Sequence, residues 1–359
     1  MKLLYATSID IPSTRANRLQ TMSMADAFHR VLGDNFLLGL RERKVGYLTD
    51  IPLTEIGKYT RSYALAWAYL RLAKERGFDR IYCREEKLLF FMVLYNQFFF
   101  RLPLTFCYEV HHLIHLQSWW HRYILRHLTR VVSVTAGMKE VLVASGFPTE
   151  ETLVSPDAVN IDMFDIAIEK DEARRALGLP TDTHIILYTG TIHEPWKGVG
   201  VLYDAMSRLG EDYLGVIVGG KPHYVEYFNS LYPPVANMRL VGHRSHDEIP
   251  LYLKAADVLV LPNSGKEEIS RIATSPMKLF EYMAAGRPIV ASDLPSIREI
   301  LNEHNALLVA PDDAEALAAG IRSIVEDGET STILATQARR DVSVYTWENR
   351  AEKILSFVS

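Results

Sequence analysis

The stretch SPMKLFEYMAAGRPIVASD, at residues 275–293, limits the fold of this 359-residue chain more than any other segment. Ser275 is a favourable N-cap for a helix, and Pro276 suits the first helical position because no backbone N–H is needed there. Gly286 is placed to end the helix, and the apolar residues 289–291 then predict a short buried strand. A turn, a short helix and a buried strand in this order are typical of α/β proteins.

The start of this predicted helix has the features of an anion-binding site. The N–H groups of Met277, Lys278 and Leu279 lack partners within the helix, and they act together with the helix dipole and the Lys278 charge. Glu281 follows farther along the same helix. We therefore expect a phosphate group at this turn, with Glu281 as the carboxylate of most interest.

Alternating predicted strands and helices divide the chain into two α/β domains. A length of 359 residues exceeds what one hydrophobic core usually serves, since domains commonly have ~100–200 residues. A polar, charged connection at 166–183, with a short helix inside it, separates two such series. We predict doubly wound parallel-sheet domains at 1–165 and 184–343, followed by a last helix within 344–359.

Apolar periodicity places the elements of both domains. In the first domain we expect strands at 3–6, 37–40, 80–83, 104–110, 131–134 and near Leu153, and helices at 19–31, 63–76, 87–100, 121–129 and 136–145. In the second we expect strands at 184–188, 214–218, 238–241, 258–261 and 289–291, and helices at 200–209, 249–255, 314–326 and 346–358.

Composition and charge argue against several classes of protein. The net charge of −5 does not suit general nucleic-acid binding. Cys83 and Cys107 are the only cysteines, so there is no disulfide framework and no cysteine metal site, which fits a reducing cytosol. The apolar run at the N-terminus is too short for a signal peptide, and polar residues interrupt the apolar segment 88–104, which we interpret as a buried helix.

A second turn, in YTGTIHEPWKG at residues 188–198, carries another candidate phosphate ligand. The segment predicts a strand, a turn at Gly190 and a helix that opens at Lys197-Gly198. Lys197 would then hold a point charge over a diphosphate. The simpler interpretation is a solvated lysine at the start of a helix.

In combination and order, the motifs resemble the GT-B-fold glycosyltransferases of family four, the glycosyltransferase group 1. The resemblance covers nearly the whole chain and rests on YTGTIHEPWKGVGVLYDAM, VGG at 218–220, LVGHRSHDEIPLYLKAADVLVLPNS, SPMKLFEYMAAGRPIVASD and YTWENRAEKIL. It implies two Rossmann-like domains facing each other across a cleft, with the nucleotide sugar mostly on the C-terminal domain and the acceptor mostly on the N-terminal one. It also implies that the last helix returns to the first domain.

The resemblance implies roles for individual residues. Glu281 would bind the ribose, since a carboxylate can accept hydrogen bonds from both hydroxyls, and Lys197 would neutralise the diphosphate. His111, at the carboxyl end of a predicted strand, would point at the donor sugar, and these three are the predicted catalytic residues. The predicted donor-binding residues are Gly190, Thr191, Gly219, Gly220, Gly242, His243, Arg244, Ser275, Pro276, Met277, Lys278 and Leu279.

The chain departs from the family's Glu-x7-Glu pattern. The first glutamate of that pattern falls at Ala273, and the arginine that commonly follows the glycine of the phosphate turn is Thr191. One charged contact to the sugar and one to the phosphates are therefore missing. We hypothesise that Arg15, Arg18 or Arg271 supplies the missing cation, because arginine suits bidentate phosphate contacts; the alternative for each is an ordinary surface arginine.

Histidines gather in one segment of the first domain. Five lie between residues 111 and 127, and His111 with His115 has the spacing of a helical metal site. Glu109 is the one acidic neighbour in sequence, and a fold of this kind needs no metal to neutralise phosphates, so we expect no metal. His112 is a weaker candidate than His111 for the contact with the sugar.

An aromatic and basic segment follows these histidines. It could lie on an anionic membrane surface or meet a lipid-linked acceptor. The alternative is a partly buried helix with a solvated basic face. Its members are Trp119, Trp120, His121, Arg122, Arg126, His127 and Arg130.

We predict a retaining glycosyltransferase that moves a sugar from a nucleoside-diphosphate sugar, its co-substrate, to a hydroxyl of a glycan or lipid-linked acceptor. Such a reaction serves the synthesis of cell-surface polysaccharides or glycolipids. We expect no cofactor, no nucleic-acid partner, and a cytoplasmic protein with peripheral contact to the inner face of the membrane. The main alternative, motivated by Ala273 and Thr191, is a non-catalytic subunit that binds sugar nucleotides. An epimerase would need acid and base carboxylates that we cannot place, and a dehydrogenase would need a GxGxxG motif.

Overall fold

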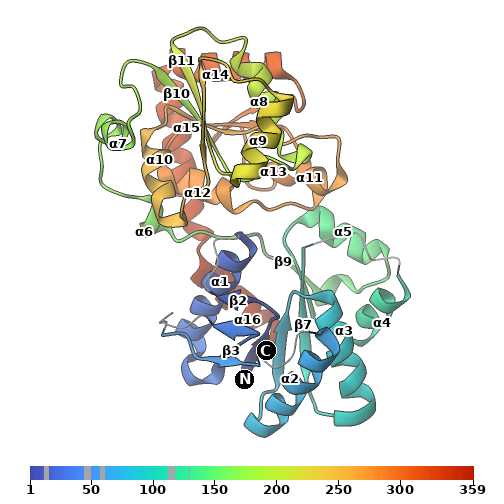
Figure 1. Cartoon of the computed structure of the whole chain (residues 1–359). Coiled ribbons are helices and arrows are strands. Elements are labelled where there is room, and N and C mark those ends of the chain that lie inside the picture. Colours follow the sequence, from blue (N-terminus) through green and yellow to red (C-terminus); the bar gives the residue numbers. More distant parts are fainter. Residues whose placement is uncertain (12–15, 44–49, 57–60, 112–117, 129) are drawn as a thin grey trace. The chain divides into compact units, whose positions relative to one another are not determined.

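The computed structural model describes residues 1–11, 16–43, 50–56, 61–111, 118–128 and 130–359 (Figure 1). Its contacts divide the chain into two compact units. Unit 1 comprises Met1–Asp157 with Trp347–Ser359, and unit 2 comprises Ala158–Thr346. The sequence placed the corresponding limits at residues 165 and 344.

Unit 1 is built on a seven-stranded parallel sheet with the strand order β5-β3-β1-β6-β7-β8-β9. The predicted strands are confirmed within a residue or two, whereas β5 was missed because it is short and its side chains are partly exposed. The strands are β1 (Leu3–Ala6), β3 (Phe36–Leu40), β5 (Leu53–Glu55), β6 (Arg80–Cys83), β7 (Thr105–Val110), β8 (Arg130–Ser133) and β9 (Thr152–Val154), with a separate parallel pair, β2 (Asp10–Ile11) and β4 (Glu42–Arg43).

The helices of unit 1 include the last helix of the chain, which packs against the first. They are α1 (Ala16–Leu32), α2 (Ser62–Arg76), α3 (Glu86–Tyr95), the π-helix η2 (Asn96–Phe100), α4 (Trp119–His127), α5 (Ala136–Ala144) and α16 (Trp347–Val358). The interpretation of 88–104 as a buried helix was wrong for its second half. Leu88, Leu89 and Met92 are buried, but Phe98 and Phe99 are more than half exposed.

Unit 2 is built on a six-stranded parallel sheet with the strand order β12-β11-β10-β13-β14-β15. Its strands are β10 (His184–Thr189), β11 (Tyr213–Val218), β12 (Met238–Gly242), β13 (Val258–Leu261), β14 (Ile289–Ser292) and β15 (Leu307–Val309). Along β10, Ile185 and Leu187 belong to one buried cluster, and Ile186 and Tyr188 belong to another. Both faces of the sheet are therefore covered, as expected for a parallel α/β sheet.

Helices connect the strands of unit 2. They are α6 (Ile161–Phe164), α7 (Lys170–Leu177), α8 (Val199–Met206), α9 (Pro222–Leu231), α10 (Ile249–Ala255), α11 (Glu268–Ile272), α12 (Met277–Ala285), α13 (Pro295–Arg298), α14 (Ala314–Glu326) and α15 (Gly328–Asp341). The sequence did not predict α9, α11, α13 and α15. Among the described helices of both units, none combines the length and the apolar character needed to cross a bilayer.

Candidate functional site

Helix α12 starts one residue later than the sequence predicted. Pro276 has an extended backbone (φ −79°, ψ 124°) and is the N-cap, so helical geometry begins at Met277. Ser275 therefore precedes the cap and does not form it, which corrects the prediction. Gly286 ends the helix in the left-handed conformation (φ 64°, ψ 39°), as predicted.

Lys278, in the first turn of α12, reaches into the turn that follows β10. Its Nζ is buried, 3.8 Å from the centroid of the Tyr188 ring. A Cβ placed on Gly190 would lie 2.6 Å from this Nζ, so the ammonium group touches the turn itself. Within the described residues no group accepts a hydrogen bond from Nζ, and burial holds the pKa of Lys278 well below its usual range.

Lys197 lies in the short helix η4 (Pro195–Lys197), which follows the same turn. Its Nζ is 3.4 Å from the centroid of the Trp196 ring and 4.0 Å from a carboxylate oxygen of Glu194. Burial lowers the pKa of Lys197 to about 8, although Glu194 opposes this shift. The charge of Lys197 also depresses the pKa of Lys278, so two mutually repelling lysines share this edge of the sheet.

Two glycines let the turns of unit 2 pack closely. Gly198 has φ +67°, and a Cβ on it would lie 1.7 Å from the carbonyl oxygen of Pro262. Gly219 has φ +144°, and a Cβ on it would lie 1.9 Å from the carbonyl oxygen of Gly190. The backbone N–H of Gly219 donates to Gly242 O at 2.8 Å. The predicted donor-binding glycines Gly190, Gly219 and Gly242 therefore contact one another through their backbones, which the absence of a Cβ permits.

Glu281 is buried in α12 and has a partner that the sequence did not indicate. His246 Nε2 lies 2.8 Å from Glu281 Oε1. Burial lowers the pKa of His246, but the hydrogen bond and the charge of Glu281 outweigh it and raise that pKa. His246 follows closely after Gly242, His243 and Arg244, so this predicted donor-binding segment is tied to the predicted ribose ligand. The 35-residue separation explains why no local pattern revealed the pair.

The candidates for the missing cation belong to different parts of the chain. Arg271 lies exposed in α11, whereas Arg18 belongs to unit 1, where its Nη1 donates to Asp10 O at 3.1 Å. Arg15 lies outside the described residues. Thr191 is exposed, and its hydroxyl donates to Glu194 Oε2 at 3.0 Å. Ala273 is buried directly after α11.

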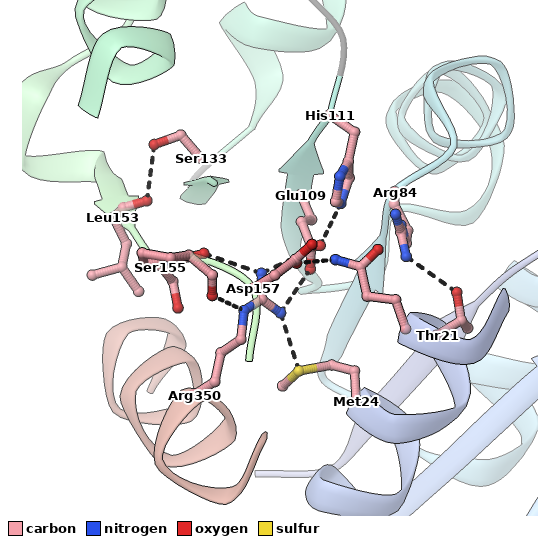
Figure 2. A network of polar contacts seen from close by, with 12 residues as sticks. Thr21, Met24, Arg84, Glu109, His111, Ser133, Leu153, Ser155, Asp157 and Arg350 are labelled. Atoms are coloured by element: carbon pink, nitrogen blue, oxygen red, sulfur yellow. Dashed lines mark hydrogen bonds and ion pairs between the residues drawn. The ribbon is translucent and has the colours of Figure 1, made fainter. Parts of the chain in front are cut away.

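In unit 1, His111 follows β7, as predicted, and bonds to a buried carboxylate (Figure 2). Its Nε2 is hydrogen-bonded to Glu109, two residues earlier on the strand. Burial and the nearby Arg84 lower the pKa of His111 to about 4 in spite of Glu109. The imidazole is therefore neutral at pH 7 and donates from Nε2. His112 and His115 lie outside the described residues.

Arg350 of α16 is the counter-ion of Glu109 (Figure 2). Its Nη1 and Nη2 lie 3.3 Å from the two carboxylate oxygens. Burial works against ionisation of Glu109, but the charges of Arg350 and His111 outweigh it and lower its pKa to about 2. Arg350 also donates to Pro156 O at 2.7 Å and to Ser155 O at 3.2 Å, so it fixes α16 to the chain beyond β9. The sequence did not indicate this residue.

Asp157, in the same network, should make unit 1 less stable as the pH rises. Its carboxyl accepts a hydrogen bond from Gln20, and burial raises its pKa to about 7 although Arg350 favours the charged form. Because this pKa exceeds the ordinary value of ~4, the stabilising contribution is full below about pH 4 and is lost as the pH rises through about 7. Asp157→Asn should therefore unfold at a higher urea concentration than the wild type at pH 8, with a smaller difference at pH 5. Equal stability at pH 8 would contradict this assignment.

A cavity of about 590 Å³ lies at the carboxyl ends of β1, β6 and β7 in unit 1. Its walls include Thr7, Ser8, Arg18, Arg84, Glu85 and His111. A larger hollow of about 830 Å³ in unit 2 contains none of the predicted site residues and lies at the opposite strand ends, near His184 and Pro288. The described residues contain no group of three or more histidine, cysteine or acidic side chains arranged to hold a metal ion.

Comparison with known proteins identifies the fold and relates the second unit to a family. The model of the family "Glycosyl transferases group 1" matches residues 183–327, which span β10 to α14 and all the predicted ligands of unit 2. The match covers the second unit and includes the Gly190 turn and helix α12. An uncharacterised glycosyltransferase of Methanocaldococcus jannaschii is 28% identical over 237 residues, 63% of this chain and 59% of that protein. Phosphatidyl-myo-inositol mannosyltransferase of Mycolicibacterium smegmatis is 28% identical over 181 residues, 50% of this chain and 45% of that protein.

Solved structures extend the similarity over both units of the chain. HepE of Anabaena in complex with UDP-glucose superposes with a TM-score of 0.79 at 20% identity, covering 99% of both chains. WaaG, a glycosyltransferase involved in lipopolysaccharide biosynthesis, gives 0.70 at 15% identity, again over 99% of both chains. The fold is therefore GT-B, as predicted. By sequence, the chain spans about half the length of the curated relatives it matches.

Proposed function

We propose that this protein is a retaining glycosyltransferase that moves a sugar from a nucleoside-diphosphate sugar to a hydroxyl acceptor in glycan or glycolipid synthesis. The observation that carries the proposal is the pair Lys197 and Lys278 beside the Gly190 turn. Two lysines with depressed pKa values at one strand edge are costly unless an anion comes between them.

The chemistry follows from this placement. Lys197, Lys278 and the first N–H groups of α12 would stabilise the negative charge that develops on the leaving diphosphate. The N–H of Leu279, predicted to lack a partner, is not among them, because it donates to Pro276 O at 2.9 Å. Glu281 would bind the ribose through its second carboxylate oxygen, while His246 holds the first. These side chains can neutralise a diphosphate without a metal, so we propose no cofactor beside the co-substrate. Retention would follow if the leaving phosphate helps to deprotonate the acceptor on the same face of the sugar.

His111 and the unit 1 cavity support a role for unit 1 in acceptor binding. Charged and hydroxyl side chains stand in the wall of the cavity, and the neutral imidazole of His111 can exchange hydrogen bonds with a hydroxyl group. Glu109 fixes the ring through Nε2 and leaves Nδ1 as the acceptor nitrogen. We infer that the acceptor is a glycan or a lipid-linked sugar.

A nucleotide and nucleotide-sugar panel tests the proposed function. Thermal shift should show a higher melting temperature with at least one nucleoside diphosphate and its sugar, because ligands that bind only the native state stabilise it. Release of nucleotide from that sugar donor, in the presence of candidate acceptors, separates an enzyme from the alternative, a non-catalytic binding subunit. Binding without release under any acceptor would favour the subunit, and no binding at all would refute both.

We further propose peripheral membrane contact through an aromatic face of unit 1. This face is formed by the exposed side chains of Tyr63 and Trp67 on α2, Phe98 and Phe99 on η2, and Trp119 on α4. Trp119, 73% exposed, contacts Phe90 at 5.7 Å between ring centroids, and Trp67 contacts Phe99 at the same distance. Arg122 and Arg126 are exposed on α4, whereas His121 of the predicted segment is fully buried. Aromatic rings with nearby arginines suit the interface of an anionic bilayer.

Removing the two arginine charges should weaken binding to anionic vesicles. A basic side chain near an anionic surface is worth ~1 kcal/mol, so Arg122→Gln/Arg126→Gln should bind phosphatidylglycerol vesicles about 30-fold more weakly in flotation assays. Arg322→Gln/Arg340→Gln, which removes the same charge from exposed positions of unit 2, is the matched control. Equal flotation of the two variants would refute the membrane contact.

A further inference from the structure

The larger cavity of unit 2, of about 830 Å³, lies at the edge of the sheet opposite the Gly190 turn. In its wall, Thr183 directly precedes β10, Asp257 directly precedes β13, and Arg287 lies two residues before β14. Because β10, β13 and β14 are neighbours in the sheet, these three residues follow one another along one edge. The volume is within the range of ~300–1,000 Å³ that is usual for sites of small molecules.

Cations outnumber anions in the wall of this cavity. Asp165 and Asp257 each pair with two cations, so the ion pairs inside the wall do not balance its charge. Within the described residues, Arg287 forms no ion pair. Six cations face three aspartates, and the wall therefore attracts anions. The cations are Lys170, Arg174, Lys254, Arg287, Arg339 and Arg340, and the anions are Asp165, Asp182 and Asp257.

Arg287 has donors that the protein leaves unpaired. Its Nη2 donates to Lys254 O at 2.6 Å, whereas Nε is closed to solvent and has no acceptor among the described residues. Nη1 forms no hydrogen bond with them either, so it remains available to a ligand. Burial and the charge of Arg174 lower the pKa of Arg287, although Asp257 and Glu169 oppose this shift. A half-buried guanidinium beside another cation is costly, and a bound anion would remove that cost.

Thr183 adds a hydroxyl group to the same edge. Its Oγ1 is closed to solvent and forms no hydrogen bond within the described residues. Arg174 Nη1 donates to Thr183 O at 3.1 Å, so this guanidinium fixes the backbone that carries the hydroxyl. Ser331 and Thr332, near the start of α15, contribute two more hydroxyl groups to the wall. Hydroxyl and guanidinium donors together suit phosphate oxygens, which accept several hydrogen bonds.

We propose that this cavity is a second binding site of unit 2, for a small molecule that carries phosphate groups. The excess of cations selects an anion, and the planar guanidinium groups of Arg287 and Arg339 suit the geometry of phosphate. A sugar phosphate and a nucleotide share this chemistry. The inference does not rest on the proposed function, because none of the predicted donor ligands lines the cavity.

Calorimetry with inorganic pyrophosphate, at constant ionic strength in chloride buffer, tests the site without interference from the donor turns. Lys197→Met/Lys278→Met removes the two lysines of those turns, and this parent variant should still bind pyrophosphate. Adding Arg287→Met should weaken the binding ~10-fold or more, because a charge-assisted contact is lost. Arg208→Met, which removes an exposed cation of unit 2 outside the cavity wall, is the matched control and should leave the affinity unchanged.

A substitution of opposite sign separates a ligand site from a structural arginine. Asp165 accepts from Arg339 at 2.6 Å and lies 3.5 Å from Lys254 Nζ. Asp165→Asn in the parent variant should therefore bind pyrophosphate about 2–5-fold more tightly, since it removes a negative charge that competes for two cations. This variant leaves the contacts of Arg287 intact, so it carries the test if Arg287→Met does not fold.

Two further probes distinguish the sources of the phosphate. A hexose bisphosphate and a nucleoside monophosphate are titrated into the parent variant and into its Arg287→Met and Asp165→Asn derivatives. The class that fills the cavity should bind more tightly than pyrophosphate and should respond to both substitutions in the same directions. Failure of all three probes to bind the parent variant would overturn the inference, and so would an affinity that neither substitution changes.

Discussion

Replacing Arg350 by methionine should lower the free energy of unfolding of unit 1 by about 3–5 kcal/mol, because it leaves the buried carboxylate of Glu109 without its counter-ion. The guanidinium also donates to Ser155 O and Pro156 O, so the variant leaves two backbone carbonyls with one partner fewer. Urea denaturation followed by tryptophan fluorescence measures the loss. Lys353→Met, an exposed change on the same helix, should cost less than about 0.5 kcal/mol.

A double variant and the pH dependence of stability separate the effect of the lost charge from the effect of the lost packing. Glu109→Met/Arg350→Met removes both charges and should recover most of the stability, because two apolar side chains replace a buried ion pair. The pKa of Glu109, held at about 2 by Arg350 and His111, lies below its usual value of ~4.3. Its stabilising contribution is present above about pH 4 and is lost as the pH falls toward 2, so the difference between Arg350→Met and the wild type should shrink over that window. A pH-independent difference, or no recovery in the double variant, would contradict the electrostatic explanation.

This network also relates the last helix to the candidate sugar contact. Arg350 contacts Glu109, and Glu109 is hydrogen-bonded to the ring of His111. A residue near the C-terminus therefore influences the tautomer of the histidine that follows β7. Arg350 also donates a hydrogen bond to the backbone carbonyl of Pro156, just before Asp157, where the first segment of unit 1 ends. Stability and the geometry around His111 therefore depend on one ion pair.

Local patterns in the sequence were enough for most of the fold. Strands such as 80–83 and 258–261 were predicted to the residue, because apolar runs bounded by polar turns mark buried parallel strands. The three-residue strands β5 and β15 were missed, since partly exposed residues give no such contrast. Helix α15 was missed because its polar and apolar residues are mixed.

The candidate site was only partly accessible from the sequence. Lys197, Lys278 and Glu281 were selected from short motifs, because Lys197 and Lys278 lie at a turn and a helix start, and Glu281 lies one turn farther along the same helix as Lys278. His246 and Arg350 bond to residues 35 and 241 positions away, and only the folded chain brings such partners together. The burial of Lys278 Nζ is a third feature of this kind, since it depends on the Gly190 turn and Tyr188 and cannot be seen in the sequence.

Replacing Lys197 by methionine should lower the rate of sugar transfer about 10²–10³-fold, if the proposed function holds, because the leaving diphosphate loses a preorganised positive charge. Burial lowers the pKa of Lys197 to about 8, so the wild type loses this charge as the pH rises through 8. The kcat/KM for the sugar donor should therefore fall above pH 8, and the profile of Lys197→Met should lack that decline.

Initial rates of nucleotide release between pH 6 and 9.5 measure both effects, with the donor chosen by the thermal-shift panel. Glu194→Gln is the informative companion, since it removes the carboxylate 4.0 Å from Nζ and keeps the lysine. Without that carboxylate the pKa of Lys197 falls further, so the decline should begin at a lower pH while the rate at pH 6 stays near that of the wild type. A Lys197→Met variant within threefold of the wild-type rate, or an unchanged decline in its profile, would show that another group neutralises the diphosphate. A normal rate in Lys197→Met with a low rate in Lys278→Met would assign that role to the buried lysine alone.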